Sequence, residues 1–148
     1  MYAKILLCYD GSREGRLALR EGARLAQITG ANVTLLAVVE TSSGNTYAIG
    51  ADAIALGQLQ RDLQEILEEG RKRLTERGLS PQVQLAFGDP VVTITRVSVE
   101  TEADLVVVGH HQHGFWTRSI AAELGDSLGC SLLLAQKTVE DPELFQNR

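Results

Sequence analysis

The chain has 148 residues, of which 44% are hydrophobic and 22% are charged, and its formal net charge is -5. This length and composition predict one soluble globular domain over residues 1–148. A negative chain is poorly suited to nucleic acids or anionic membranes, so we expect neither as a partner. No apolar run approaches the roughly 20 residues that span a bilayer. The apolar segment before Asp10 is too short for a signal peptide, so we expect a cytoplasmic protein.

The two cysteines, Cys8 and Cys130, lie in or beside apolar runs that read as strands. Cysteine without a disulfide behaves as a small hydrophobic residue, and disulfides are rare in the cytoplasm. We therefore expect two buried free thiols.

The first third of the chain reads as a strand, a helix and a second strand. Residues 4–9 are a short apolar run, and Ser12 is a suitable N-cap for a helix that ends at Thr29, before Gly30. Residues 32–39 are rich in Val and Leu, as in a buried strand. Two such strands joined by a helix predict a parallel pair with a right-handed crossover.

The middle third begins with a polar loop over residues 40–50. A long helix is expected over 51–77, closed by Gly78, and Gly70 within it either weakens the helix or lets a neighbour approach closely. Residues 83–87 alternate in the manner of a half-exposed strand at a sheet edge.

Residues 91–99 are so rich in β-branched side chains that propensity alone would predict a strand. However, Asp89 is a good helix cap and Pro90 fits the first helical position. We therefore predict a helix after Pro90, because the cap and the alternation of strands and helices outweigh a weak local preference.

The last third contains the most distinctive stretch. A valine-rich strand over residues 103–108 runs into a polar loop that begins at Gly109 and contains all three histidines. A short helix over 117–128, a strand over 131–135 and a polar tail over 137–148 are expected to follow. Ligands of open α/β sheets bind outside the carboxyl ends of the strands, so we expect the loop after Val108 to take part in binding.

Three segments, at residues 4–12, 88–90 and 103–112, resemble the universal stress protein family in their order and spacing. The resemblance covers residues 2–136 and is greatest to the A-type branch. It implies a flavodoxin-like (Rossmann-like) three-layer α/β sandwich with a five-stranded parallel sheet of order 3-2-1-4-5. It also implies a stress-response role and a homodimer.

Many members of this family bind ATP through a loop with three spaced glycines followed by Ser or Thr, in which backbone amides approach the phosphates. Gly109 matches the first glycine, but Gln112 stands at the second, with Gly114 two residues later. Arg118 replaces the third glycine, and Ser119 occupies the Ser/Thr position. The A-type branch shares this departure and is considered not to bind ATP. We therefore expect ATP binding to be weak or absent.

The resemblance also suggests further nucleotide contacts. Asp10 matches an acid that meets ribose or adenine, Val38 matches an apolar support for adenine, and Arg118 could contact phosphate in place of backbone amides. Each residue has a structural alternative. Asp10 could hydrogen-bond its own turn, Val38 could be core, and Gly109 could simply let the strand turn. The sequence leaves these alternatives open.

Other chemistry has little support. His111 and His113 are weak candidates for a transition-metal site, but their loop supplies no Cys, Asp or Glu to complete a ligand set, so we expect no metal. The sequence has no G-x-S-x-G elbow, complete P-loop or Cys-x-x-Cys motif. We therefore expect no enzymatic activity.

The last strand predicts how the protein assembles. Residues 131–135 contain three consecutive leucines, yet this strand lies at an edge of the implied sheet. An apolar edge with unpaired backbone groups is a liability in a soluble monomer. We expect a homodimer through residues 131–136, formed about a two-fold axis.

Two functions follow from the sequence. The first is a non-enzymatic, cytoplasmic stress-response protein that acts as a homodimer. The alternative is an ATP-binding switch that uses a degenerate glycine loop. The broken glycine pattern after Gly109 favours the first, since fold alone does not choose between them.

Overall fold

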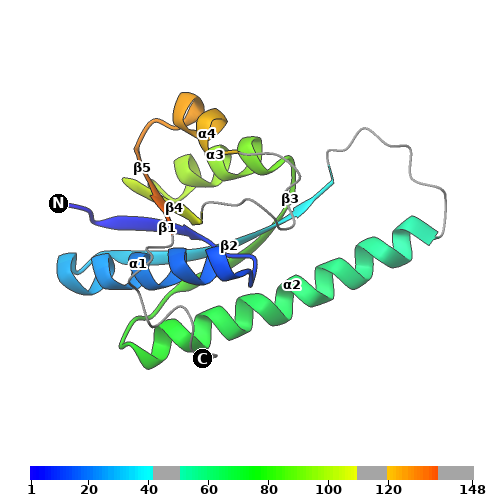
Figure 1. Cartoon of the computed structure of the whole chain (residues 1–148), viewed down its shortest axis with the longest axis horizontal. Coiled ribbons are helices and arrows are strands. Elements are labelled where there is room, and N and C mark those ends of the chain that lie inside the picture. The colour runs from blue at the N-terminus through cyan, green and yellow to red at the C-terminus, as the bar shows by residue number, and fades with distance from the viewer. Residues whose placement is uncertain (42–50, 110–119, 137–148) are drawn as a thin grey trace.

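A computed structural model of the chain describes residues 1–41, 51–109 and 120–136 (Figure 1). Strands and helices alternate along the chain, as the sequence predicts. The elements are β1 (Lys4–Cys8), α1 (Arg13–Thr29), β2 (Asn32–Glu40), α2 (Ala51–Glu76), β3 (Gln82–Gly88), α3 (Pro90–Glu100), β4 (Leu105–Gly109), α4 (Ala121–Ser127) and β5 (Ser131–Ala135).

The five strands form one parallel sheet of order β3-β2-β1-β4-β5. Helices α1 and α2 cover one face, and α3 and α4 cover the other, which makes three layers (Figure 1). The predicted fold and strand order are confirmed. In particular, β3 pairs with β2 in parallel, as an edge strand.

Successive side chains of a strand point to opposite sides, and apolar clusters lie on both faces of the sheet. In β1, Ile5 and Leu7 face α1 and α2, whereas Leu6 and Cys8 face α3 and α4. Burial on both faces explains why the central strands are continuously apolar in sequence.

The predicted limits of α1 are confirmed. The Ser12 side chain accepts a hydrogen bond from the Gly15 amide at 3.0 Å, which caps the helix start. Gly30 adopts a left-handed conformation with φ 72°, and its amide donates to the Ala26 carbonyl at 2.9 Å. Local chemistry therefore sets both ends of this helix.

Gly70 lets the long helix α2 lie close to the sheet. A Cβ atom at this position would lie 2.8 Å from the ring of Tyr9 and 2.9 Å from the Leu35 side chain. Of the two predicted roles of this glycine, close approach is confirmed.

In the parts of the chain described above, no helix has the length and hydrophobicity needed to cross a bilayer.

Helix α3 confirms that capping and packing overcome β-propensity. The Asp89 carboxylate accepts from the Val92 amide at 3.0 Å, and Pro90 occupies the first turn. Val91, Ile94 and Val97 are buried against the sheet. Burial of this face stabilises a segment whose intrinsic helix preference is low.

Two predictions in the last third need revision or remain open. Helix α4 follows Ile120, and the predicted start at residue 117 lies outside the described residues.

Both cysteines are free, and Cys8 is buried. Cys130 is only half-buried, so the prediction of two buried thiols is wrong for Cys130. It precedes the edge strand β5, which has a neighbouring strand on one side only among the described residues. Burial raises the pKa of the Cys8 thiol far above its ordinary value.

Candidate functional site

The candidate site lies at the carboxyl ends of the central strands. The neighbours β1 and β4 form the topological switch point of the sheet, because α1 follows β1 on one face and α4 follows β4 on the other. Ligands of open α/β sheets bind at such a point. Asp10 follows β1, Val38 lies near the end of β2, and Gly109 ends β4. The fold therefore brings three predicted residues to the same end of the sheet, where the carboxyl ends of the strands lie.

The remaining candidates lie outside the described residues. These are Gly114, Arg118 and Ser119 for a nucleotide, and His111 and His113 for a metal. Their roles stay predictions. Within the described ranges, no group of three or more His, Cys, Asp or Glu side chains could hold a metal ion.

Asp10 is tied into the turn between β1 and α1. Its side chain is buried, with 5% exposed. Oδ1 accepts from the Ser12 amide at 2.9 Å and from the Ser12 hydroxyl. The Ser12 oxygen accepts in turn from the Gly15 amide. Asp10 therefore has the turn role that the sequence allowed, and it also steadies the cap of α1.

Two glycines allow this turn to close. Gly11 has φ 75°, and a Cβ atom there would lie 3.0 Å from the Ile66 side chain of α2. At Gly15, a Cβ atom would lie 2.5 Å from Oδ1 of Asp10. Sequence reasoning missed Gly15, although its position three residues after the Ser12 cap is where a cap contacts the helix backbone.

Gly109 is a glycine for a reason that the sequence does not show. Its φ is not positive, whereas among the glycines that the structure describes, Gly11, Gly30, Gly78 and Gly88 have positive values. A Cβ atom at Gly109 would lie 2.3 Å from the carbonyl oxygen of Glu14, in the first turn of α1. A left-handed backbone conformation is therefore not the reason for this glycine. This glycine lets α1 pack against the end of β4.

Val38 is part of the core. It is 8% exposed and lies in register with Ala86 of β3. The same apolar cluster contains Val91 and Ile94 of α3. The described contacts of Val38 are thus core contacts, which is one of the two alternatives that follow from the sequence.

A polar network beside Asp10 joins β1, α1 and α2, and sequence reasoning missed it. The Tyr9 hydroxyl donates to Oε1 of Glu69 at 3.1 Å, and Nε of Arg73 donates to the same oxygen at 2.8 Å. Arg16 of α1 lies 3.9 Å from that oxygen. Burial, and then the nearby charge of Glu69, raise the pKa of Tyr9 to about 12. Tyr9 therefore stays protonated and acts as a hydrogen-bond donor at neutral pH.

In the described part of this site, the Ser12 hydroxyl forms structural hydrogen bonds. The Ser12 hydroxyl both donates to Asp10 and accepts from Gly15, so it is already engaged in the helix cap. A serine nucleophile needs a base such as His or Lys within hydrogen-bonding distance. The hydroxyl's hydrogen-bond acceptor among the described residues is the Asp10 carboxylate.

Comparison with known proteins identifies the relatives of this chain. A model of the universal stress protein family matches residues 1–135. A curated relative, "Universal stress protein A homolog" of Haemophilus ducreyi, is 29% identical over 127 residues, which are 82% of this chain and 86% of the relative.

Solved structures agree on the fold. Universal stress protein UspA from Lactobacillus plantarum superposes with a TM-score of 0.78 at 21% identity, over 90% of this chain and 97% of that protein. A universal stress protein in complex with cAMP gives 0.71 at 19% identity, over 93% and 99%. A universal stress protein family member from Arabidopsis thaliana with AMP bound gives 0.71 at 16% identity, over 98% and 99%. These likenesses confirm the flavodoxin-like fold.

Proposed function

The chain belongs to the universal stress protein family, and on this basis we propose that it is a non-enzymatic, cytoplasmic stress-response protein that acts as a homodimer through β5. Two features of the described residues support the parts of this proposal. The engaged Asp10–Ser12 turn supports a role without catalysis. Two free thiols suit a reducing compartment.

The observation that carries the proposal is the edge strand β5. It pairs with β4 along one side, and within the described residues no strand lies along its other side. Its three leucines, Leu132, Leu133 and Leu134, are only half-buried. The strand also contains no charged residue and no proline, which are the usual protection of an exposed edge. A second copy of β5 would satisfy its backbone groups and cover its leucines.

The register of β5 indicates which backbone groups are available to a partner. The Ser131 amide donates to the Asp104 carbonyl at 3.3 Å, on the β4 side. Because backbone groups alternate along a strand, Leu133 also directs its amide toward β4, while Leu132 and Leu134 direct theirs outward. Proline at Leu133 would therefore break the sheet itself, whereas proline at Leu134 would remove an outward donor.

Sedimentation equilibrium at tens of micromolar tests this interface. We expect a dimer for the unchanged chain and a shift toward monomer for Leu134→Pro. Leu134→Ala is the matched control, because it shortens the side chain but keeps the outward amide, and it should remain more dimeric than the proline variant. A monomeric parent chain, or a Leu134→Pro variant as dimeric as the parent, would rule out the β5 interface.

Adenine-nucleotide binding at the carboxyl ends of β1, β2 and β4 is a second candidate function. The observation that favours it is the pair of similar structures with cAMP and with AMP. Asp10, Val38 and Gly109 lie together at the carboxyl ends of the strands of this sheet. Gln112 and Arg118 replace loop glycines, so fewer backbone amides can approach a phosphate. We propose weak binding that serves regulation and not turnover.

Calorimetric titration with ATP, ADP, AMP and cAMP tests this second candidate. We expect dissociation constants weaker than about 10 μM, which corresponds to about -7 kcal/mol. Arg118→Ala and Ser119→Ala should each weaken any binding that is measured, because their side chains are expected to contact phosphate. A tighter constant would contradict the argument from the missing glycines. Unchanged affinity in both variants would show that the loop alignment is wrong.

A further inference from the structure

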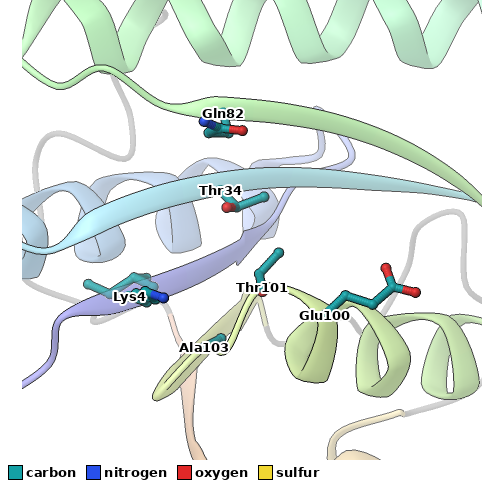
Figure 2. Close-up of a pocket in the computed structure, with 7 residues that line it drawn as sticks. Lys4, Thr34, Gln82, Glu100, Thr101 and Ala103 are labelled. Carbon is teal, nitrogen blue, oxygen red and sulfur yellow. The ribbon is translucent and has the colours of Figure 1, made fainter.

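A pocket lies at the opposite end of the sheet from the candidate nucleotide site. It has a volume of about 340 Å³ and opens over the amino ends of β1, β2 and β3, beside the end of α3 (Figure 2). Ligand pockets commonly measure roughly 300–1,000 Å³, so this volume suits a small molecule. The side chains that line it are Lys4, Thr34, Gln82, Glu100, Thr101 and Ala103, together with Ile5.

The floor of this pocket is unusually polar for a parallel sheet. On the face toward α3, each of the three strands changes from apolar near its carboxyl end to polar near its amino end. Leu6 and Leu36 belong to the core beneath α3, whereas Lys4 and Thr34, two residues earlier on the same strands, line the pocket. Gln82 lies beside Thr34, since the two are partners in the register of β2 and β3. These polar side chains therefore line the pocket at the amino end of the sheet and do not join the core beneath α3.

Thr34 and Gln82 have unused hydrogen-bonding capacity. Neither side chain forms a hydrogen bond with another residue in the parts of the chain that the structure describes. Thr34 is nevertheless half-buried. Together they offer a hydroxyl, which both donates and accepts, and an amide with two donor hydrogens and one acceptor oxygen. Figure 2 shows Thr34 between Gln82 and Thr101, so these polar groups face a common space.

Opposite charges flank these groups. Lys4 and Glu100 lie on either side of Thr101 in Figure 2. Lys4 Nζ is 3.7 Å from Glu102 in a pair whose side chains are 46% and 79% exposed, so this pair holds the ammonium only weakly. Glu100 accepts from Arg96 at 2.9 Å in a pair whose side chains are 50% and 49% exposed, so this pair also holds the Glu100 carboxylate only weakly. The pocket therefore offers a cation for a carboxylate and a carboxylate for an ammonium.

We propose that this pocket binds a small zwitterion, a free amino acid, with the ligand carboxylate toward Lys4 and its ammonium group toward Glu100. Thr34 and Gln82 supply uncharged hydrogen bonds to the ligand's charged groups or to a polar side chain. The pocket lies at the amino ends of the strands and is therefore distinct from the candidate nucleotide site at their carboxyl ends. Helix α3 connects the two, because Asp89 caps it at the carboxyl edge of the sheet and Thr101 ends it at the pocket.

Amide NMR titration of the full chain with each of the twenty protein amino acids tests the proposal. We expect at least one to produce saturable shifts centred on the amides of Lys4, Thr34, Gln82 and Thr101. The N-acetyl and carboxamide derivatives of the tightest amino acid lack the ammonium and the carboxylate, respectively, and each should bind at least tenfold more weakly. No saturable shift up to about 10 mM for any amino acid would overturn the proposal. If both derivatives bind as tightly as the unmodified amino acid, the zwitterion assignment is overturned.

Variants separate this site from others on the molecule. Lys4→Met and Thr34→Val should each weaken binding at least tenfold. Val has nearly the shape of Thr and a high strand propensity, so the second variant keeps the test valid if the first fails to fold. Lys72→Met, at an exposed position of α2, is the matched control and should bind as the parent does. Parent-like binding by both pocket variants would show that the amino acid binds elsewhere.

Discussion

At the carboxyl end of the sheet, the close approach of α1 to β1 and β4 requires glycine at two positions. Gly15 leaves room for the Asp10 carboxylate, and Gly109 leaves room for the backbone of Glu14. Both glycines thus serve the packing of one helix end. The resemblance to a phosphate loop gave Gly109 a ligand role, but the packing accounts for this glycine without any ligand.

Replacing Gly109 with Ala should destabilise the fold. The new Cβ atom would lie 2.3 Å from the Glu14 carbonyl oxygen, and backbone atoms move less easily than a flexible side chain. We expect a loss of about 1–3 kcal/mol, measured by urea denaturation, as for other overpacked sites. Gly125→Ala is the control, since a Cβ atom there meets nothing within 4 Å and lies in helix α4. A Gly109→Ala variant as stable as the parent would contradict the close approach.

Asp104 holds the first strand against the fourth in a pH-dependent manner. Its carboxylate accepts from the Ala3 amide at 2.8 Å and the Lys4 amide at 3.1 Å. These backbone donors lower the pKa of Asp104 below its ordinary value. The stabilisation is therefore present above the ordinary pKa of an aspartate and is lost as the pH falls through the lower pKa of the folded state.

The variant Asp104→Asn should reveal this dependence. Its free energy of unfolding should lie below that of the parent at pH 7, because the amide carries no charge and offers one acceptor oxygen. The difference should shrink as the pH is lowered below about 4, where the unfolded parent becomes protonated. Denaturation series at several pH values measure it. A difference that stays constant from neutral to acidic pH would exclude the charged hydrogen bonds as its source.

At the scale of elements, α3 shows how a cap and a buried face decide a helix. Its sequence is mostly β-branched, and Val92 and Val99 remain exposed, with 67% and 72% of their surfaces accessible. Those two residues gain little from packing. The helix therefore depends on its buried face and on the Asp89 cap.

Asp89→Ala should lower the free energy of unfolding by about 1 kcal/mol, the usual effect of losing a helix N-cap. Thermal or urea denaturation measures the change. Asp126→Ala, at an exposed position within α4, is the control for removing one negative charge, and its effect should be much smaller. If both variants lose equal stability, the cap at Asp89 is not what maintains α3.

At the scale of the whole molecule, the sheet has two ends and two edges with different roles. The carboxyl end holds the family's candidate nucleotide residues, and the amino end holds the polar pocket. The edge strand β5 carries half-buried leucines, and the edge strand β3 exposes Val83 and Phe87 by 40% and 45%. Assembly through β5 would leave both ends of the sheet accessible, so dimerisation and ligand binding are compatible.

The sequence alone determined the elements and their order, because those depend on neighbouring residues. Ser12 and Gly30 limit α1, and Asp89 starts α3, through contacts within a few positions of the chain. The family resemblance then supplied the strand order, which the structure confirms.

Only the tertiary structure decided what depends on distant segments. The reason for Gly109 lies in α1, and the partner of Tyr9 is Glu69, sixty positions away. The polar pocket joins Lys4, Thr34 and Gln82, which are separated along the chain by whole elements. No local pattern encodes such meetings, because they arise only when parallel crossovers bring remote strands into register.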